Sequence, residues 1–372
     1  MMITAAVLQR TGAGAPYAES LPLALTALDL APPHAGELLV RIEAAGVCHS
    51  DLSVVNGDRV RPLPMALGHE AVATVVAMGS ADTGFAAGDR VVLAFLPACG
   101  RCEQCAAGLG YLCPVGAAAN GRGELIGGGS RLSDAGANVH HHLGVSAFAT
   151  HAVIDARSAV KIDADIPVEI AALFGCAVLT GVGAVVNSAA VRLGESVAVY
   201  GLGGVGLAAV MGAVASGAQP VIAVDPVESK RAIALSVGAT VAVHPRDAAD
   251  AIRAHTASGV DVAIETVGRA SVLAEAYAAT RRGGRTVTVG LPNPAEQLTL
   301  SAVSLVADGK TIIGSYMGSA IPRRDIPRYI ALWRAGRLPV EKLLTATRPM
   351  AEINAAFDDL ASGAAIRQVM IP

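Results

Sequence analysis

The stretch SVAVYGLGGVGLAAVMGAVASGAQPVIAVD, residues 196–225, decides the fold of one half of this chain. SVAVY predicts a buried strand, and the segment from about 204 to 216 predicts a helix. VIAV predicts a second strand, which ends at Asp225. Between the first strand and the helix lies GLGGVG. A strand, a glycine-rich turn, a helix, a second strand and an acid in this order predict a dinucleotide-binding unit.

Each glycine of this motif has a physical reason to be there. Gly201 permits the tight turn, Gly203 lets the backbone approach the pyrophosphate, and Gly206 lets the helix pack against the strand. The helix begins near Gly204 and Val205, so its free N–H groups and the positive end of its dipole face the phosphates. These five residues are the predicted contacts to the cofactor's pyrophosphate.

The acid at the end of the second strand bears on the choice of cofactor. Asp225 lies 19 residues after Gly206 and can accept hydrogen bonds from ribose hydroxyls. Its charge would repel a 2′-phosphate, which predicts NAD rather than NADP. The alternative is that Asp225 is an ordinary turn residue at a strand end.

The alternation of strands and helices continues beyond residue 225. Short apolar runs at 240–243, 261–266, 285–290 and 311–316 predict four more strands. Helix-like segments lie near 228–237, 247–256 and 271–282, whereas the connection to the last strand shows no clear pattern. Six strands alternating with helices predict an α/β fold with a doubly wound parallel sheet.

The rest of the chain has a different pattern. Residues 1–175 are rich in Gly and Pro and contain short alternating runs such as ELLVRIEAAGV and AVATVVAMG, which predicts an irregular, mostly β domain. Residues 318–372 have a partly helical pattern and end in IRQVMIP. The chain is therefore expected to form two domains.

Composition excludes several classes of partner. The 372 residues are 53% hydrophobic and 16% charged, with a net charge of −3 and no block of like charge, which argues against nucleic acid and membrane as partners. The uncharged stretch 197–224 is broken by glycines and reads as a buried strand–helix–strand unit rather than a membrane span. The first residues lack a signal-peptide pattern, so a cytoplasmic location is expected.

Four of the six cysteines lie in CGRCEQCAAGLGYLC, residues 99–113. Cys99, Cys102, Cys105 and Cys113 have the spacing C-x2-C-x2-C-x7-C on a glycine-rich loop. Four thiolates without an open position are typical of a structural zinc site. An iron–sulfur cluster is the main alternative, since it takes the same ligands. A nucleic-acid zinc ribbon fits poorly, because the loop holds only one Arg and one Glu.

The other two cysteines are far apart in the chain. Cys48 lies in GVCHSD, Cys176 in FGCAVLTG, and His69 lies between them in GHE. Two thiolates and one imidazole would make a three-ligand zinc site with a fourth position open for water or substrate. Taken singly, each residue is better explained as a buried structural side chain.

With these motifs together, the chain resembles the zinc-dependent alcohol dehydrogenases of the medium-chain dehydrogenase/reductase superfamily, and it is similar to their liver-type branch over nearly its full length. The resemblance rests on GVCHSD, GHE, the four-cysteine lobe, HHHLGVSAFATHAV, GCAVLTGVGAV, GLGGVG and IRQVMIP. It implies a GroES-like, mostly-β catalytic domain formed by 1–177 and 318–372, with a structural zinc lobe at 97–114. Residues 178–317 would form the NAD-binding Rossmann domain.

The resemblance also implies roles around the catalytic zinc. Cys48, His69 and Cys176 match the zinc ligands. Other positions match residues that act beside the metal: Asp51 orients the ligating imidazole, Glu70 approaches the zinc during ligand exchange, and Ser50 hydrogen-bonds the substrate alcohol. Ser50 could instead be a simple turn residue. The triplet His140–His142 looks like a metal cluster, but the family has a similar stretch without a metal role, so it is assigned to structure.

Further matches concern the cofactor and the proton. Thr180 matches a nicotinamide contact, Lys230 a ribose contact and Arg367 a pyrophosphate contact, although the last two could be solvated charges. His49 stands where the family often has an Arg that faces the pyrophosphate. In the liver-type relatives a proton relay ends at a histidine whose position here is Ser53. The proton is therefore expected to leave directly to water or buffer, or by way of His49.

The predicted activity is reversible hydride transfer between a primary or secondary alcohol and NAD, giving an aldehyde or ketone, with two zinc ions per subunit in a homodimer. Phe95 and Leu291 match apolar pocket residues, which favours a hydrophobic alcohol. Relatives that act on glutathione-bound formaldehyde carry an Arg where this chain has Ala117. That substrate class and a non-catalytic protein binding NAD and zinc are the alternatives.

Overall fold

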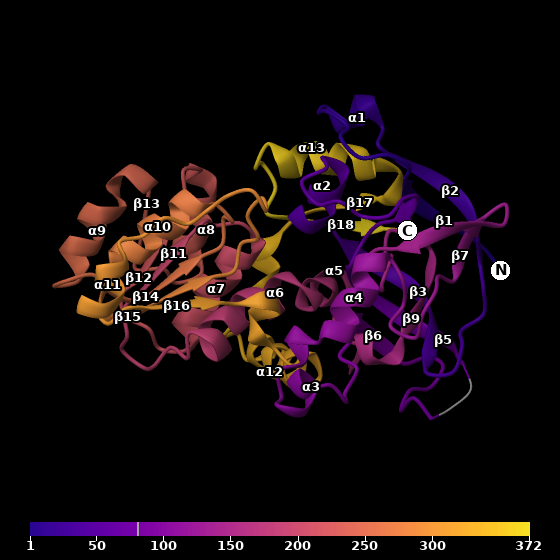
Figure 1. Cartoon of the computed structure of the whole chain (residues 1–372), viewed down its shortest axis with the longest axis horizontal. Coiled ribbons are helices and arrows are strands. Elements are labelled where there is room, and N and C mark those ends of the chain that lie inside the picture. The colour runs from indigo at the N-terminus through magenta and orange to yellow at the C-terminus, as the bar shows by residue number, and fades with distance from the viewer. Residues whose placement is uncertain (80–81) are drawn as a thin grey trace. The chain divides into compact units, whose positions relative to one another are not determined.

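The structure is a computed structural model that describes residues 1–79 and 82–372 (Figure 1). It divides into two compact units. The first contains Met1–Cys176, Ile321–Pro327 and Leu344–Pro372, and the second contains Ala177–Ala320 and Arg328–Leu343. The sequence assigned 318–372 to the first unit as one block, whereas residues 328–343 group with the second.

The second unit is built on a six-stranded sheet in the order β13-β12-β11-β14-β15-β16, and every neighbouring pair is parallel (Figure 1). The strands are β11 (Val197–Tyr200), β12 (Val221–Val224), β13 (Val241–Val243), β14 (Val260–Glu265), β15 (Thr280–Thr288) and β16 (Thr311–Gly314). The chain order reverses beside β11, which defines a doubly wound sheet. The predicted fold class is confirmed.

Helices connect these strands, as expected for parallel neighbours. Between the strands lie α7 (Gly204–Ala215), α8 (Glu228–Ser236), η5 (Pro245–Asp247), α9 (Ala248–His255), α10 (Ala270–Ala279) and α11 (Ala302–Ala307). The helix α6 (Ala177–Gly183), continued by η4 (Ala184–Ser188), precedes β11, and η6 (Tyr316–Ser319) follows β16. The short α11 provides the connection before β16 that the sequence left undefined. One core cluster combines Ala198 and Tyr200 of β11 with Ile252 of α9 and Ala276 of α10.

The segment 328–343 contains the later part of α12 (Pro322–Arg334) and the turn η7 (Val340–Leu343). The side chain of Arg337 donates a hydrogen bond to the Ala215 carbonyl at the end of α7, and η7 packs on the same helix. These contacts explain why this segment groups with the second unit.

The first unit contains two β-structures. A closed barrel has the order β1-β2-β7-β8-β4, with β1 (Met2–Leu8), β2 (Leu23–Leu30), β4 (Met65–Ala66), β7 (Leu132–Asp134) and β8 (Ala137–His141). A seven-stranded sheet has the order β10-β6-β5-β3-β18-β17, and β9 also pairs with β3. Its strands are β3 (Glu37–Gly46), β5 (Glu70–Met78), β6 (Arg90–Leu93), β9 (His151–Asp155), β10 (Ala159–Ile162), β17 (Leu344–Pro349) and β18 (Arg367–Ile371).

Short helices surround these sheets: α1 (Tyr17–Ser20), α2 (His49–Val55), α3 (Glu103–Ala106), η1 (Gly110–Leu112), α4 (Pro114–Arg122), η2 (Ala156–Ser158), α5 (Val168–Ala171), η3 (Ala172–Gly175), η8 (Met350–Glu352) and α13 (Ile353–Ala361). Phe357 of α13 packs edge-on against Phe148 in the main core, with ring centroids 6.4 Å apart. The chain end IRQVMIP forms β18 and pairs antiparallel with β3, Val369 opposite Gly46. The predicted mostly-β domain is thus confirmed.

Among the described residues, no single helix is long and apolar enough to cross a membrane. One bent pair, Val168–Gly175 with Ala177–Ser188, reaches that length and composition only when its two parts are taken together. The uncharged stretch 197–224 forms β11, α7 and β12 in succession, as predicted.

Candidate active site and metal centres

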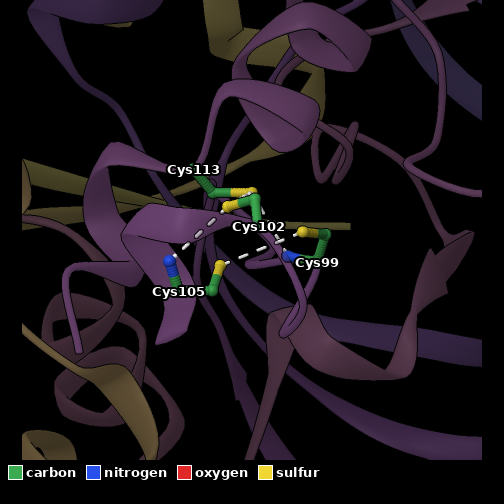
Figure 2. A group of neighbouring side chains, drawn as sticks. All are labelled: Cys99, Cys102, Cys105 and Cys113. Carbon is green, nitrogen blue, oxygen red and sulfur yellow. Dashed lines mark hydrogen bonds between the residues drawn. The ribbon is translucent and has the colours of Figure 1, made fainter. Parts of the chain in front are cut away.

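The four-cysteine lobe brings its sulfur atoms together around one point (Figure 2). All four Sγ atoms lie within 4.8 Å of one another. The Cys99 and Cys105 sulfurs are 4.0 Å apart, and the Cys102 and Cys113 sulfurs are 3.9 Å apart. Two thiolates on one tetrahedral zinc at about 2.3 Å stand roughly 3.8 Å apart, so the geometry fits a single ion. A multi-iron cluster needs its thiolates more widely spaced.

Backbone N–H groups of the lobe point at these sulfurs. Cys113 Sγ accepts from the amides of Cys99 and Gly116, at 3.3 and 3.4 Å, and Cys102 Sγ accepts from Cys105 at 3.5 Å. Cys102 and Cys113 are the N-cap residues of α3 and α4. Cysteines bind metal as thiolates, and these amide N–H groups are directed at the sulfur atoms that would carry the negative charge.

The second cluster collects Cys48, His69 and Cys176 from three separate elements. Cys48 is the N-cap of α2, His69 directly precedes β5, and Cys176 directly follows η3. The antiparallel pairing of β3 with β5 sets Gly46 opposite Glu70 and so brings Cys48 close to His69. The ligand atoms of the three residues lie within 4.8 Å of one another, and all three residues are buried.

Two observations show that this cluster fits a zinc ion. The Nδ1 atom of His69 lies 3.1 Å from Asp51 Oδ1, which leaves Nε2 as the nitrogen for a metal. Among the described residues, His69 Nε2 is buried and has no hydrogen-bond partner. A buried imidazole nitrogen beside two thiols is costly unless something binds it. Three ligands leave the fourth tetrahedral position open.

Asp51 is the residue that holds His69. It is fully buried, and its Oδ1 atom accepts a hydrogen bond from the Gly68 amide at 3.1 Å in addition to the contact with His69. Oδ1 also lies 3.1 Å from Nδ1 of His142. Burial alone would raise the pKa of Asp51, but the two imidazoles lower it to about 2. The carboxylate is therefore charged near neutral pH and lies against Nδ1 of His69.

The histidine triplet does not behave as one unit. His141 is buried, accepts from the Arg131 amide at Nε2 and lies 3.3 Å from Ser146 Oγ, and burial lowers its pKa to about 3. His140 is partly exposed. His142 instead forms a third group of potential ligand atoms with Asp51 and His69. Sequence reasoning missed this position, because three adjacent histidines give no sign of which one faces the site.

Two serines of α2 have different surroundings. The Ser50 hydroxyl lies 3.8 Å from Cys48 Sγ, beside the second cluster. The Ser53 hydroxyl donates to the Ser50 carbonyl at 2.8 Å, a bond within its own helix. His49, the first residue of α2, is exposed. Ser50 is therefore the hydroxyl next to the thiol ligands, whereas Ser53 is bonded locally.

Two buried ionisable side chains, Glu70 and Arg367, interact electrostatically near Cys48. Glu70 is fully buried, and its carboxylate approaches the Gly46 backbone so closely that a Cβ on Gly46 would stand 2.7 Å from Oε1. Burial raises the pKa of Glu70 to about 7, against the opposing charge of Arg367. Arg367 is 3% exposed and donates to the Val47 carbonyl at 3.0 Å. The Arg367 guanidinium therefore lies near Cys48 and Glu70. Its predicted contact with the cofactor's pyrophosphate stays a prediction.

In the second unit the glycine motif adopts the expected strand–turn–helix form. Gly201 follows β11 with φ +88°, and Gly203 is the N-cap of α7. A Cβ on Gly206 would stand 1.8 Å from the Gly201 carbonyl oxygen, so only glycine fits there. A Cβ on Gly203 would meet no described atom within 4 Å, which leaves room for a phosphate at the helix start.

Asp225 is held rigidly at the end of β12. Its Oδ2 atom accepts from the Leu202 amide at 2.7 Å and its Oδ1 atom from the Val227 amide at 2.8 Å. Arg231 of α8 donates through Nη1 to the carbonyls of Asp225 and Pro226, both at 2.8 Å. The glycine motif and its acid do not indicate Arg231, although the six-residue spacing from Asp225 places this residue in the first turns of the next helix.

The remaining predicted residues are placed as follows. Thr180 is buried in α6, and Lys230 is a partly exposed residue of α8. Phe95 is 8% exposed and packs edge-on against His69, with ring centroids 5.4 Å apart. Leu291 follows β15 in the second unit and is 54% exposed. Ala117 is exposed on α4. The contacts of these side chains with a cofactor or substrate stay predictions.

Two family models match the chain. Residues 34–164 match the alcohol dehydrogenase GroES-like domain, and residues 204–334 match the zinc-binding dehydrogenase domain. The first range contains His69 and the four-cysteine lobe, as well as Cys48. The second begins at the glycine motif.

Solved structures resemble the chain over its whole length. An alcohol dehydrogenase zinc-binding domain protein from Burkholderia ambifaria is 38% identical with a TM-score of 0.94, and the alignment covers 100% of this chain and 99% of that one. Benzyl alcohol dehydrogenase from Acinetobacter calcoaceticus is 33% identical with a TM-score of 0.92 and the same coverage. A putative zinc-binding dehydrogenase from Sinorhizobium meliloti, bound to NADP, is 25% identical with a TM-score of 0.81 and full coverage of both chains.

Proposed function

We propose, since this chain belongs to the zinc-dependent alcohol dehydrogenases of the medium-chain dehydrogenase superfamily, that it interconverts an alcohol and an aldehyde or ketone with NAD. The observation that carries the proposal is the buried set Cys48, His69 and Cys176, whose atoms converge within 4.8 Å. A site that only stabilises the fold would have four protein ligands, as the cysteine lobe has.

The residues of the first unit would act as follows. When bound, zinc supplies a Lewis acid that lowers the pKa of the substrate hydroxyl toward neutrality. Cys48, His69 and Cys176 would hold it, and Asp51 keeps Nδ1 of His69 occupied so that Nε2 would be free to bind the metal. Ser50 then accepts the substrate proton and passes its own onward, because a serine hydroxyl transfers protons but stores none near neutral pH. The lobe would hold the second zinc of the subunit.

The second unit would bind the cofactor. A bound NAD would supply the hydride acceptor. The N-terminus of α7 and Gly203 would face its pyrophosphate, and Asp225 would face the adenosine ribose. Two backbone amides donate to the Asp225 carboxylate and restrict its rotation. The carboxylate would therefore stay close to a 2′-phosphate and repel it. This fixed charge supports the use of NAD rather than NADP by this chain. The Sinorhizobium meliloti structure, in contrast, is bound to NADP.

The substrate proposed is a hydrophobic primary or secondary alcohol. Phe95 presents an apolar ring beside His69, and the Acinetobacter calcoaceticus relative is a benzyl alcohol dehydrogenase. A glutathione adduct is the second candidate within the family. Its carboxylates need a cation, and position 117 holds alanine instead of the Arg of enzymes that use such adducts.

A panel of alcohols tests the proposal. Aromatic, aliphatic and glutathione-derived alcohols are offered with NAD and separately with NADP, and formation of the reduced cofactor is followed by absorbance. Turnover with apolar alcohols and NAD is expected. Turnover only with the glutathione adduct would favour the second candidate, and a protein that binds NAD and zinc without any turnover would contradict the proposed activity.

The choice of cofactor has its own test. Asp225→Ser removes the fixed charge and is expected to raise the kcat/KM ratio of NADP to NAD by about tenfold, or 1.4 kcal/mol of relative binding. Asp250→Ser, at an exposed acid of α9, is the matched control. A wild-type enzyme that already prefers NADP would show that Asp225 does not set the preference.

A homodimer is also proposed. Strand β16 is an end strand of the six-stranded sheet, and within the described part of the chain no strand pairs with its outer edge, where a strand of a second copy could add. The neighbouring α11 exposes Val303 at 70% and Val306 at 85%. Light scattering on the purified protein tests this state, with a monomer as the contradicting result.

A further inference from the structure

His142 makes two contacts with the residues that support the zinc cluster. Its Nδ1 atom lies 3.1 Å from Asp51 Oδ1, and its ring packs edge-on against the ring of His69, with centroids 5.6 Å apart and an interplanar angle of 86°. The side chain is 2% exposed. The mechanism proposed above gives it no part.

The backbone holds this side chain in place. The parallel pairing of β4 with β8 sets Ala66 beside His141, just before the two segments that carry Gly68–His69 and His142. The His142 amide is directed at both the Ala66 carbonyl, at 3.3 Å, and Ser146 Oγ, at 3.0 Å. Because the same short ladder positions both imidazoles, their relative placement is a property of the barrel.

Asp51 depends on its neighbours for its orientation. Oδ1 accepts a hydrogen bond from the Gly68 amide and lies close to the Nδ1 atoms of both His69 and His142. Oδ2 is buried and has no hydrogen-bond partner among the described residues. The His142 contact is short but lacks the direction of a well-aligned hydrogen bond, so it acts mainly through charge and dipole. A buried carboxylate that is held at one oxygen is sensitive to the loss of any donor there.

We propose that His142 is a positioning residue for the catalytic zinc site. It acts through Asp51 to hold the His69 ring in its metal-binding orientation. This inference rests on the proposed function insofar as the cluster holds zinc. His142 contributes no ligand atom to that ion. It keeps the Asp51 carboxylate directed at Nδ1 of His69, and its ring supports the His69 ring from the side.

The test measures zinc release, which does not require turnover. Purified holoenzyme is mixed with a chromophoric chelator, and the two zinc ions are released in separate kinetic phases, one from the second cluster and one from the cysteine lobe. Substitution of Cys176 by serine identifies the phase of the second cluster. Outer partners of metal ligands change metal affinity by about 10–100-fold, and a partner one residue further out should have a smaller effect.

His142→Phe keeps a ring and removes Nδ1, so it should speed release from the second cluster about fivefold and leave the lobe phase unchanged. His142→Asn places an amide N–H near the position of Nδ1 and should release zinc at nearly the wild-type rate. His140→Phe, a ring exchange two residues earlier, is the control and should change neither phase.

A double-mutant cycle tests whether the effect passes through Asp51. In an Asp51→Asn background the carboxylate is gone, so His142→Phe should add little to the release rate. A fivefold effect that persists there would overturn the proposed route. The proposal is also overturned if His142→Phe leaves zinc release unchanged, if it speeds both phases equally, or if the wild-type protein binds a third metal at Asp51, His69 and His142. A wild-type second cluster without zinc would contradict the proposed function as well.

Discussion

The two candidate metal clusters of the first unit differ in how the chain builds them. The lobe takes its four sulfurs, and the amides that donate to them, from residues 99–116. The second cluster takes Cys48, His69 and Cys176 from three elements and depends on a buried supporting layer. Spacing along the chain is therefore enough to define a closed site, whereas an open site needs ligands that distant segments hold in place.

The largest effect expected from this difference is the loss of activity on removing a ligand from the second cluster. Cys176→Ser should lower kcat by more than about a hundredfold, because even partners outside the metal's ligands change function by 10–100-fold. Metal analysis should still find the lobe's zinc, and the unfolding curve should stay close to wild type. A variant that keeps most of its activity would show that Cys176 is not a ligand.

The lobe should give the opposite result. Cys102→Ser opens a site that contributes folding free energy through its metal, and we expect a loss of roughly 3 kcal/mol in unfolding free energy with little change in kcat at low temperature. Denaturant unfolding with parallel kinetics measures both. Loss of activity without loss of stability would reverse the assignment of the two clusters.

The third comparison is between two serines of α2. The Ser50 hydroxyl lies beside the second cluster, whereas the Ser53 hydroxyl is bonded within its own helix. Ser50→Ala should lower kcat by about 10²-fold or more, as for a placed acid–base group. Ser53→Ala should change kcat less than about twofold, because its hydroxyl is bonded to the Ser50 carbonyl. Equal losses in both variants, with zinc content intact, would place Ser53 in the proton route.

The fold could be predicted because its signals are local. Parallel strands buried on both faces appear as short apolar runs, and the runs at 197–200 and 221–224 form β11 and β12. The predicted helix near 271–282 ends early, at Ala279, because Thr280 begins β15. The contacts of segment 328–343 with α7 could not be predicted, since they leave no trace in its own sequence.

For the candidate sites, the sequence alone predicted the seven cysteine and histidine residues that the structure gathers in two clusters, and the glycine motif, because each depends on residue type at a short spacing or on a recognisable motif. Only the tertiary structure decided which of His140, His141 and His142 faces Asp51, that Arg367 is buried beside Glu70, and that Arg231 holds the turn at Asp225. The first two depend on the pairings of β4 with β8 and of β18 with β3, and the third on how α8 packs after β12. A strand alternates its side chains between two faces, so one pairing register places a side chain at the site or away from it, and register is a property of two segments together.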